Sequence, residues 1–323
     1  MPLQPHAERP RPLMPFLCAI LMLLILTTAC GGESEYRKVA FEPRIETEPV
    51  ATHDTDRPRM QVAVAAMISP RETFIYYREL VDYLLDRLGY DAELVQRKTY
   101  EEVNALLAEG AIDLAFICTG PFVDGQGASS FEAIATPIVR GEPFYRSYLI
   151  VHRESAFQSL ADLEGKDFAF TDPDSNTGSF VPRFWLNLMG TTPDIFFNNF
   201  TFTYSHDNSI MAVAKKLVDG AAVDGHMWDY YQQHNAYHTS QTRVIRVSEP
   251  FGSPPVVVSR RMDPELKSAL IQLILTMHED PEGHRILSAL SIDRFTAPES
   301  QWYDPVREML QRIGNTRVSA DGA

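Results

Sequence analysis

The sequence predicts an α/β protein made of two units, each built on its own sheet. Short apolar segments alternate with segments of helical spacing from Met60 to Ile313. The alternation starts afresh at Asp167–Phe170, after two further apolar segments at Ala133–Val139 and Tyr148–His152. The length of 323 residues also exceeds what a single core usually supports. Apolar residues at 45% and charged residues at 22% exclude a mostly disordered chain, a coiled coil and a polytopic membrane protein.

The first unit reads strand, helix, strand, helix, strand. We expect strands at Met60–Met67, Ala92–Val95 and Ile112–Cys118, and helices at Arg71–Leu88 and Thr99–Glu109. Each helix is followed directly by a glycine, Gly89 or Gly110, as is typical of a helix C-terminus. This order predicts a parallel sheet with helices on both faces.

The second unit repeats the alternation. We expect strands at Asp167–Phe170, Thr201–Tyr204, Ala221–Val223 and Val244–Val247, and helices near Gly178–Met189, Ser209–Val218 and Met227–His234. The chain then gives a strand at Pro254–Ser259 and helices around Pro264–His278, Gly283–Leu290 and Pro305–Ile313. The simplest arrangement inserts the second unit into the first.

The N-terminus reads as a secretory signal over residues 1–29. Two arginines precede an apolar run, Phe16–Leu26, which is shorter than the roughly 20 residues a membrane-spanning helix needs. Small residues and then Cys30 follow this run, and the ending resembles a bacterial lipobox, in which the cysteine is lipidated. The alternative is plain cleavage near Ala29 with an ordinary Cys30. Residues 30–58 lack apolar periodicity and are expected to form a flexible tether.

Charge and cysteine content restrict the partners. The formal net charge is −14, and an acidic surface repels phosphate backbones, so nucleic acid is excluded as a partner. A small anion is not excluded, because local dipoles make such a site. Once the signal is removed and Cys30 carries lipid, Cys118 stands alone, so no intramolecular disulfide forms and Cys118 is expected to be a core thiol.

The most informative motif is Phe170–Pro182, which follows a strand and opens a helix. Asp174, Ser175, Asn176 and Thr177 are all residue types that cap a helix start, and one would suffice for capping. Several hydroxyl and amide side chains beside the free N–H groups of a helix start make a cradle for an anion. The alternative is an over-supplied cap and loop.

The run from Asp172 to Pro182 resembles the signature of the phosphate-, phosphite- and phosphonate-binding proteins of ABC transporters, the PhnD-like group. Three other segments resemble that family in order and spacing: Ala111–Pro121, Tyr145–Val151 with the following Asp162-Leu163, and Ser205–Val213 with Val218–Asp224. The chain departs from the family at Asn176, where the family has Thr, and at Thr177, where it has Ser. Both substitutes donate hydrogen bonds, so anion binding is retained while selectivity is open.

The resemblance implies a set of ligand-binding residues. They are Tyr100, Tyr145, Ser175, Asn176, Thr177, His206, Asp224 and His226. Read alone, the tyrosines would be packing residues, and His206 and Asp224 would cap the helices that follow them. A carboxylate such as Asp224 repels an anion unless it accepts a hydrogen bond from it, which a protonated phosphorus oxyanion or a ligand ammonium gives and sulfate does not. We therefore expect phosphate, phosphite or phosphonates to be preferred over sulfate.

The resemblance also implies the type II periplasmic-binding-protein fold, with two α/β lobes joined by a hinge and the ligand in the cleft between them. Lobe 1 would comprise residues 59–147 and 250–316, lobe 2 residues 148–249, and residues 317–323 a disordered tail. Closure would be a hinge motion about the crossings near Tyr145–Val151 and Pro250–Val256.

The implied function is solute capture for a membrane permease by a monomeric periplasmic lipoprotein that needs no cofactor. Two alternatives stay open: a sensor or partner-docking protein that uses the same cleft, and an enzyme acting on a phosphorylated small molecule. His234 and His238 stand four residues apart, but a solvated helix end is a better interpretation of this pair than a zinc site.

Overall fold

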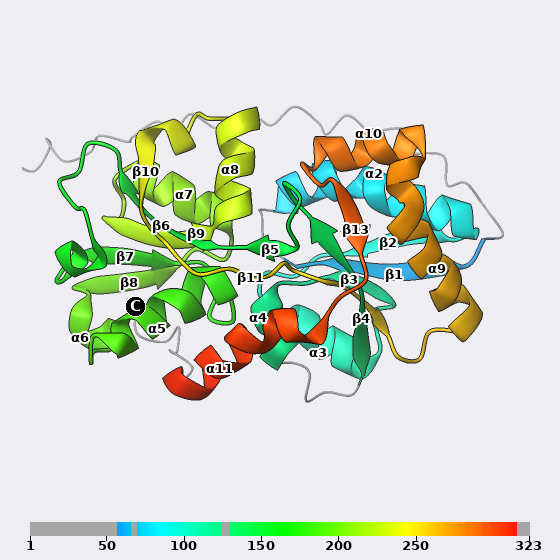
Figure 1. Ribbon diagram of the computed structural model, residues 1–323, viewed down its shortest axis with the longest axis horizontal. Helices are drawn as coiled ribbons and strands as arrows, with labels where there is room; N and C mark the ends of the chain where they lie inside the picture. The colour runs from blue at the N-terminus through cyan, green and yellow to red at the C-terminus, as the bar shows by residue number, and fades with distance from the viewer. Residues whose placement is uncertain (1–56, 66–69, 125–129, 315–323) are drawn as a thin grey trace, which may run out of the picture. The chain divides into compact units, whose positions relative to one another are not determined.

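The computed structural model describes residues 57–65, 70–124 and 130–314 (Figure 1). The expected signal peptide, Cys30, nearly all of the tether and the C-terminal tail lie outside these residues. The last two residues assigned to the tether contact the folded body instead. The Arg57 guanidinium donates to the carbonyl oxygen of Tyr90 at 2.7 Å, and the Asp91 N–H donates to the carbonyl oxygen of Pro58 at 2.9 Å.

One sheet has six strands in the order β13-β4-β12-β3-β1-β2. The strands are β1 (Arg59–Val64), β2 (Asp91–Val95), β3 (Leu114–Phe116), β4 (Phe131–Ile138), β12 (Val256–Ser259) and β13 (Arg294–Thr296). The expected parallel pairing holds for β1, β2 and β3, whereas β12 is antiparallel to both β3 and β4. The sheet therefore contains both parallel and antiparallel pairs. The antiparallel strand β12 belongs to the part of the chain that returns from the second unit.

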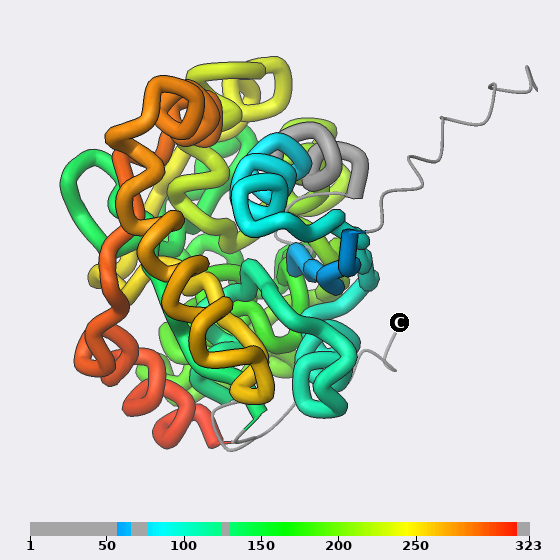
Figure 2. Tube along the Cα trace, turned by 90° about the vertical axis from the view of Figure 1, so that its right-hand side faces the viewer, coloured from blue at the N-terminus to red at the C-terminus, as the bar shows by residue number. Residues whose placement is uncertain are grey.

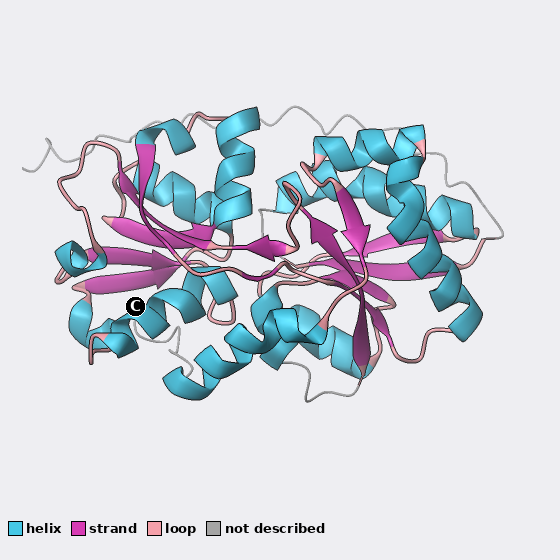
Figure 3. Ribbon diagram, in the orientation of Figure 1, coloured by secondary structure: helices cyan, strands magenta, loops and turns pink. Residues whose placement is uncertain are grey.

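Helices cover both faces of this sheet (Figure 3). The side chains of β1 alternate between the two faces. Val62 and Val64 pack against α2 (Pro70–Leu88), α9 (Pro264–Thr276) and α10 (Pro281–Ala289). Ala63 faces the opposite way, towards α3 (Tyr100–Glu109) and α4 (Thr119–Asp124). In Figure 2, α9 and α10 (orange) lie beside α2 (cyan). We call this sheet with these helices lobe 1.

The other sheet has five strands in the order β10-β6-β9-β7-β8. The strands are β6 (Ser147–His152), β7 (Asp167–Phe170), β8 (Asn199–Phe202), β9 (Gly220–Asp224) and β10 (Thr242–Val247). On one face pack α7 (His206–Ala214) and α8 (Gly225–His234). On the other pack α5 (Val181–Leu188) and α6 (Pro193–Phe196), around buried aromatic rings such as Phe168. We call this sheet with these helices lobe 2.

The chain passes between the lobes through two short strands that pair with each other. These are β5 (Phe144–Tyr145) and β11 (Phe251–Gly252), which run antiparallel at the centre of Figure 1. Both lie within or beside the crossings that the sequence indicates. The last helix, α11 (Asp304–Ile313), packs on α4 of lobe 1 and on α5 of lobe 2. It therefore bridges the lobes, although its place in the sequence predicts a position in lobe 1.

Several predicted boundaries are wrong by a few residues. The helix expected at Ser209–Val218 is α7, which begins at His206 because Ser205 takes the N-cap position. The strand expected at Thr201–Tyr204 is β8, which begins at Asn199, and the backbone of Tyr204 has a positive φ of 59°. Among the described residues, the short helices α4 and α6 and the short strands β5, β11 and β13 were not predicted.

Candidate functional site

The segment that the sequence singles out forms a tight helix start, which we call the cradle (Asp172–Phe180). It opens with a π-helical turn, η3 (Asn176–Phe180), that continues directly into α5. Ser175 is the N-cap, and its Oγ accepts from the Gly178 N–H at 3.0 Å. A Cβ on Gly178 would lie 2.4 Å from Thr171 Oγ1, so only glycine fits there. One of the candidate caps therefore caps the helix, and the side chains that follow it are left for other partners.

The cradle carries buried polar atoms that lack a hydrogen-bond partner among the described residues. They are Asn176 Oδ1, Thr177 Oγ1 and Ser179 Oγ. All three residues are fully buried. An unpaired buried polar group costs about 1–3 kcal/mol, so such a group of atoms needs an explanation. A ligand that hydrogen-bonds to them would supply one.

His206 lies at the first position of α7 and is fully buried. Its Nδ1 accepts from the backbone N–H of Asp224 at 3.1 Å, which assigns the proton of the neutral ring to Nε2. Burial lowers the pKa of His206 to about 3, so the ring is neutral at pH 7. Nε2 has no partner among the described residues. His206 therefore presents a buried N–H donor without a protein acceptor.

Asp224 ends β9 and caps α8, as its sequence position alone suggested. One carboxylate oxygen accepts from the N–H groups of His226 at 2.7 Å and Met227 at 3.3 Å. Burial raises the pKa of Asp224 to about 7 even though these bonds lower it. The His226 ring has its pKa lowered to about 4, again mainly by burial. The carboxyl group thus titrates near neutral pH beside two neutral imidazoles.

Lobe 1 meets the cradle through Tyr100 and α4. The Tyr100 N–H, at the start of α3, donates to Asp172 Oδ2 at 3.2 Å, and the buried Tyr100 hydroxyl has no partner among the described residues. Burial is the main cause that raises the pKa of this hydroxyl well above 10, and it raises the pKa of Asp172 to about 6. A Cβ on Gly120 would lie 2.1 Å from the Asp174 carbonyl oxygen, so the two lobes are in direct contact here.

Tyr145, in β5, links the crossing strand to the cradle. Asn176 Nδ2 donates to its hydroxyl at 3.0 Å, and the centres of the Tyr145 and His226 rings are 6.2 Å apart. Cys118 lies on the lobe 1 side of the same contact as a buried free thiol, as the sequence predicts. Burial raises the pKa of Cys118 to about 11, and the N–H groups of Asn176 and Gly120 offset part of this rise.

The structure therefore brings the predicted site residues together where the lobes meet. Hydrogen bonds join Asn176 to Tyr145, and Asp224 to both His206 and His226. Tyr100 is joined instead to Asp172, at the start of the cradle. Sequence reasoning missed Thr171 and Ser179. Thr171 Oγ1 lies 3.2 Å from His206 Nδ1 and 3.3 Å from Ser209 Oγ, and so holds β7 and α7 together. The position of Thr171, directly after the β7 strand, is the signal that could have identified it.

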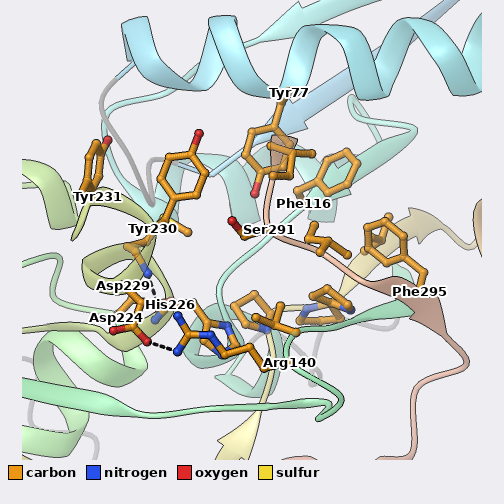
Figure 4. Close-up of a pocket in the computed structure, with 18 of the residues that line it drawn as sticks. Tyr77, Phe116, Arg140, Asp224, His226, Asp229, Tyr230, Tyr231, Ser291 and Phe295 are labelled. Carbon is orange, nitrogen blue, oxygen red and sulfur yellow. Dashed lines mark hydrogen bonds and ion pairs between the residues drawn. The ribbon is translucent and has the colours of Figure 1, made fainter. Parts of the chain in front are cut away.

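A pocket of about 100 Å³ opens beside Asp224 and His226, between α8 of lobe 2 and lobe 1 (Figure 4). We call it the side pocket. Arg140, at the edge of this pocket, pairs with Asp229 at 2.6 Å, and Arg183, in the helix that follows the cradle, is buried near the negative charge of Asp174. Negative charge at this site would therefore be held mainly by hydrogen-bond donors and the helix start.

The described residues contain no cluster of three or more His, Cys, Asp or Glu side chains that could hold a metal ion. Helix α8 ends at His234, so His234 and His238 do not share a helical face. The His234 ring stacks on Tyr230 at 4.4 Å between centres. Within the same residues, no helix is both long and apolar enough to cross a membrane.

Comparison with known proteins gives one family model that matches residues 62–303, described as the periplasmic substrate-binding protein of phosphonate ABC transporters. The phosphonates-binding periplasmic protein of Escherichia coli is 26% identical over 52% of this chain and 51% of its own length. The phosphate-import protein PhnD of Mycolicibacterium smegmatis is 26% identical over 64% of each chain. The matches thus span only about half to two thirds of these relatives.

A solved structure shares the fold. It is a binding-protein component of an ABC phosphonate transporter from Pseudomonas aeruginosa, with a TM-score of 0.75 and 21% identity, and the match covers 80% of this chain and 87% of that one. The two-lobe type II periplasmic-binding-protein fold that the sequence predicts is confirmed.

Proposed function

Because this chain belongs to the family of periplasmic substrate-binding proteins of phosphonate ABC transporters, we propose that it captures a phosphorus oxyanion at the cradle and delivers it to a permease. The observation that carries this proposal is the group of buried polar atoms without partners that gathers around the cradle. Thr177, Ser179, His206 and Tyr100 each contribute one such atom, and each of these atoms can donate a hydrogen bond. The lobes would close over the ligand by a hinge motion at β5 and β11.

The oxyanion would be held by neutral donors. Helix-start N–H groups favour an anion, and hydroxyl and imidazole N–H groups add directed bonds. Asn176 fits this role after a half-turn of its amide, which lets the Tyr145 hydroxyl donate to Oδ1 and leaves Nδ2 free to donate to the ligand. The two amide orientations have the same shape, and the ligand decides between them.

Asp224 supports selectivity for phosphorus. A carboxyl group with a pKa of about 7 is protonated in a large fraction of molecules at neutral pH, and a protonated carboxyl donates a hydrogen bond to an oxyanion. When it is ionised, only an anion that carries its own proton can bond to it. Phosphate, phosphite and phosphonates carry such a proton near pH 7 and sulfate does not, so sulfate should bind more weakly.

Replacement of Thr177 by valine tests the cradle. Thr177→Val removes the hydroxyl with little change of shape, and we expect the affinity for methylphosphonate, phosphite or phosphate to fall about 10- to 100-fold, the value of one hydrogen bond to a charged group. The matched control is Thr239→Val, because Thr239 is also buried with a hydroxyl that lacks a partner among the described residues, but lies outside the cradle. Titration calorimetry measures the affinity of each variant for the phosphorus oxyanions, and a titration with sulfate measures the preference for phosphorus.

Uptake of labelled ligand by cells that carry the Thr177→Val protein would fall in parallel if the captured ligand is delivered to a permease. Binding of no phosphorus oxyanion by the unaltered protein would overturn the proposal. Equal loss of affinity in the two threonine variants would show that the cradle is not the place where the oxyanion binds.

We further propose that the protein works as a monomer held at the membrane by lipid on Cys30. A Cys30→Ser protein is expected to move from the membrane fraction to the soluble periplasmic fraction, while the purified protein keeps its ligand affinity. Detection in fractionated cells with an antibody measures this. Retention of the variant in the membrane would contradict the anchor, and Cys118→Ser is the control because that thiol is buried in the folded body.

A further inference from the structure

The side pocket adjoins the proposed oxyanion site through two shared residues. Asp224 and His226 line it, and the same two residues adjoin His206 and Tyr145 of the cradle network. A ligand whose phosphorus group sits at the cradle would therefore direct its substituent past Asp224 into this pocket.

The walls of the pocket are mostly apolar and come from both lobes. Figure 4 shows Tyr77 of α2, Phe116 of β3 and Phe295 of β13 facing Tyr230 of α8 across the space. Prolines and aliphatic side chains, among them Ile292, complete the wall. A surface of this kind gains free energy by burying hydrocarbon.

Beyond Asp224, the charged groups that line the pocket are already paired with each other. Arg140 contacts Asp229 at 2.6 Å, and the Tyr148 hydroxyl donates to the same Asp229 carboxylate at 3.3 Å. An ammonium group on the ligand would thus find Asp229 occupied and the Arg140 cation beside it, and a second carboxylate would meet Asp229. Apart from Asp224, which faces the oxyanion itself, neither charged tail would find a free partner of opposite sign among the described residues that line the pocket.

We infer that this protein selects phosphonates with an uncharged alkyl or small aryl substituent, which the side pocket takes up, over aminoalkylphosphonates and bare oxyanions. This inference rests on the proposed function and names its ligand class. The size agrees with it: a cavity of about 150 Å³ takes up a benzene molecule. The 100 Å³ available here suits a short alkyl chain or a ring that protrudes in part.

Calorimetry with the unaltered protein tests the inference through a ligand series: phosphate, phosphite, methyl-, ethyl- and propylphosphonate, and 2-aminoethylphosphonate. One buried methylene contributes about 0.8 kcal/mol, which is about a fourfold change in affinity. Propylphosphonate should therefore bind about 15-fold more tightly than methylphosphonate. It should also bind at least tenfold more tightly than 2-aminoethylphosphonate, which has the same number of heavy atoms.

Two variants locate the effect. Ile292→Asn should reduce the preference for propylphosphonate over methylphosphonate to less than about fivefold. The control is Ile195→Asn, the same change at a residue that is 78% exposed and outside the pocket, and it should leave this preference unchanged. Arg140→Gln frees Asp229 and should move the ratio of propyl to aminoethyl affinities about tenfold towards the ammonium ligand.

Equal affinities along the alkyl series, or tighter binding of 2-aminoethylphosphonate, would overturn this inference while leaving the proposed function standing. A propyl preference unchanged by Ile292→Asn would also overturn it, since the chain would then lie elsewhere. If no ligand in the series binds, the proposed function fails, and this inference fails with it.

Discussion

A Gly120→Ala protein is expected to bind phosphorus oxyanions at least 100-fold more weakly than the unaltered protein, without loss of stability. The added Cβ would lie 2.1 Å from the Asp174 carbonyl oxygen and 2.9 Å from the Asn176 nitrogen. Both of these are backbone atoms of the cradle, which belongs to the other lobe, so neither yields as a flexible side chain would. The added methyl group would therefore keep the lobes apart at this point. Tyr100 of lobe 1 and the cradle of lobe 2 could then not both contact the ligand.

The free energy of unfolding should hardly change, because Gly120 lies inside α4 and alanine favours a helix by up to about 1 kcal/mol over glycine. Gly165→Ala is the control with the opposite behaviour. Nothing lies within 4 Å of a Cβ there, but φ is +67°, so stability should fall by about 1 kcal/mol while affinity stays unchanged. Calorimetry and thermal unfolding of both variants measure the contrast. Normal affinity in Gly120→Ala would show that binding does not require this lobe contact.

The fold and the cradle were accessible from sequence because local chemistry determines them. The alternation of apolar runs gave both sheets, and the cluster of capping residues before Pro182 marked a helix start with more polar groups than capping needs. Which of these residues caps the helix, and which keep a side chain without a partner, could not be predicted from the sequence. This depends on the folded geometry, in which Gly178 packs against Thr171, Ser175 caps the helix, and the Thr177 hydroxyl has no partner among the described residues.

The side pocket could not have been predicted, since it is assembled from segments far apart in the chain. Tyr77 and Phe295 contribute to one wall although more than 200 residues separate them, and the Arg140–Asp229 pair joins residues 89 positions apart. Two-residue strands such as β5 and β11 leave no periodic pattern either. Likewise, the amphipathic pattern of α11 shows that one face is buried but not that the face spans both lobes.

The charge state of Asp224 is a property of the folded site that sequence could not give, and it predicts an unusual pH dependence. Burial raises the pKa of Asp224 from 3.8 to about 7, and the carboxylate of Asp229 adds to the rise. Tyr77, Tyr100 and Tyr145 have their own pKa values raised and stay neutral, as do His206 and His226 at pH 7. Asp224 is therefore the group beside the cradle that changes charge around pH 7, whereas Asp172, with a pKa of about 6, is already largely ionised there.

An Asp224→Asn protein should lose this dependence. Asparagine caps a helix as well as aspartate does and donates a hydrogen bond at every pH, so the variant mimics the protonated carboxyl. Above pH 7 the ionised Asp224 of the unaltered protein repels the bound anion, and its affinity should fall up to tenfold per pH unit. At pH 8.5 Asp224→Asn should then bind methylphosphonate up to about 30-fold more tightly than the unaltered protein, and about equally at pH 6.

The ligand-free proteins provide an independent check. A carboxyl group whose folded pKa lies above its unfolded value contributes stability at low pH that is lost as the pH rises through 7. The unaltered protein should therefore unfold at progressively lower temperature than Asp224→Asn as the pH rises from about 4 to about 7, and the difference should level off above pH 7. The second ionisation of the ligand affects both proteins alike, so the ratio of their affinities isolates Asp224. Parallel affinity curves across this pH range would show that Asp224 does not face the bound anion.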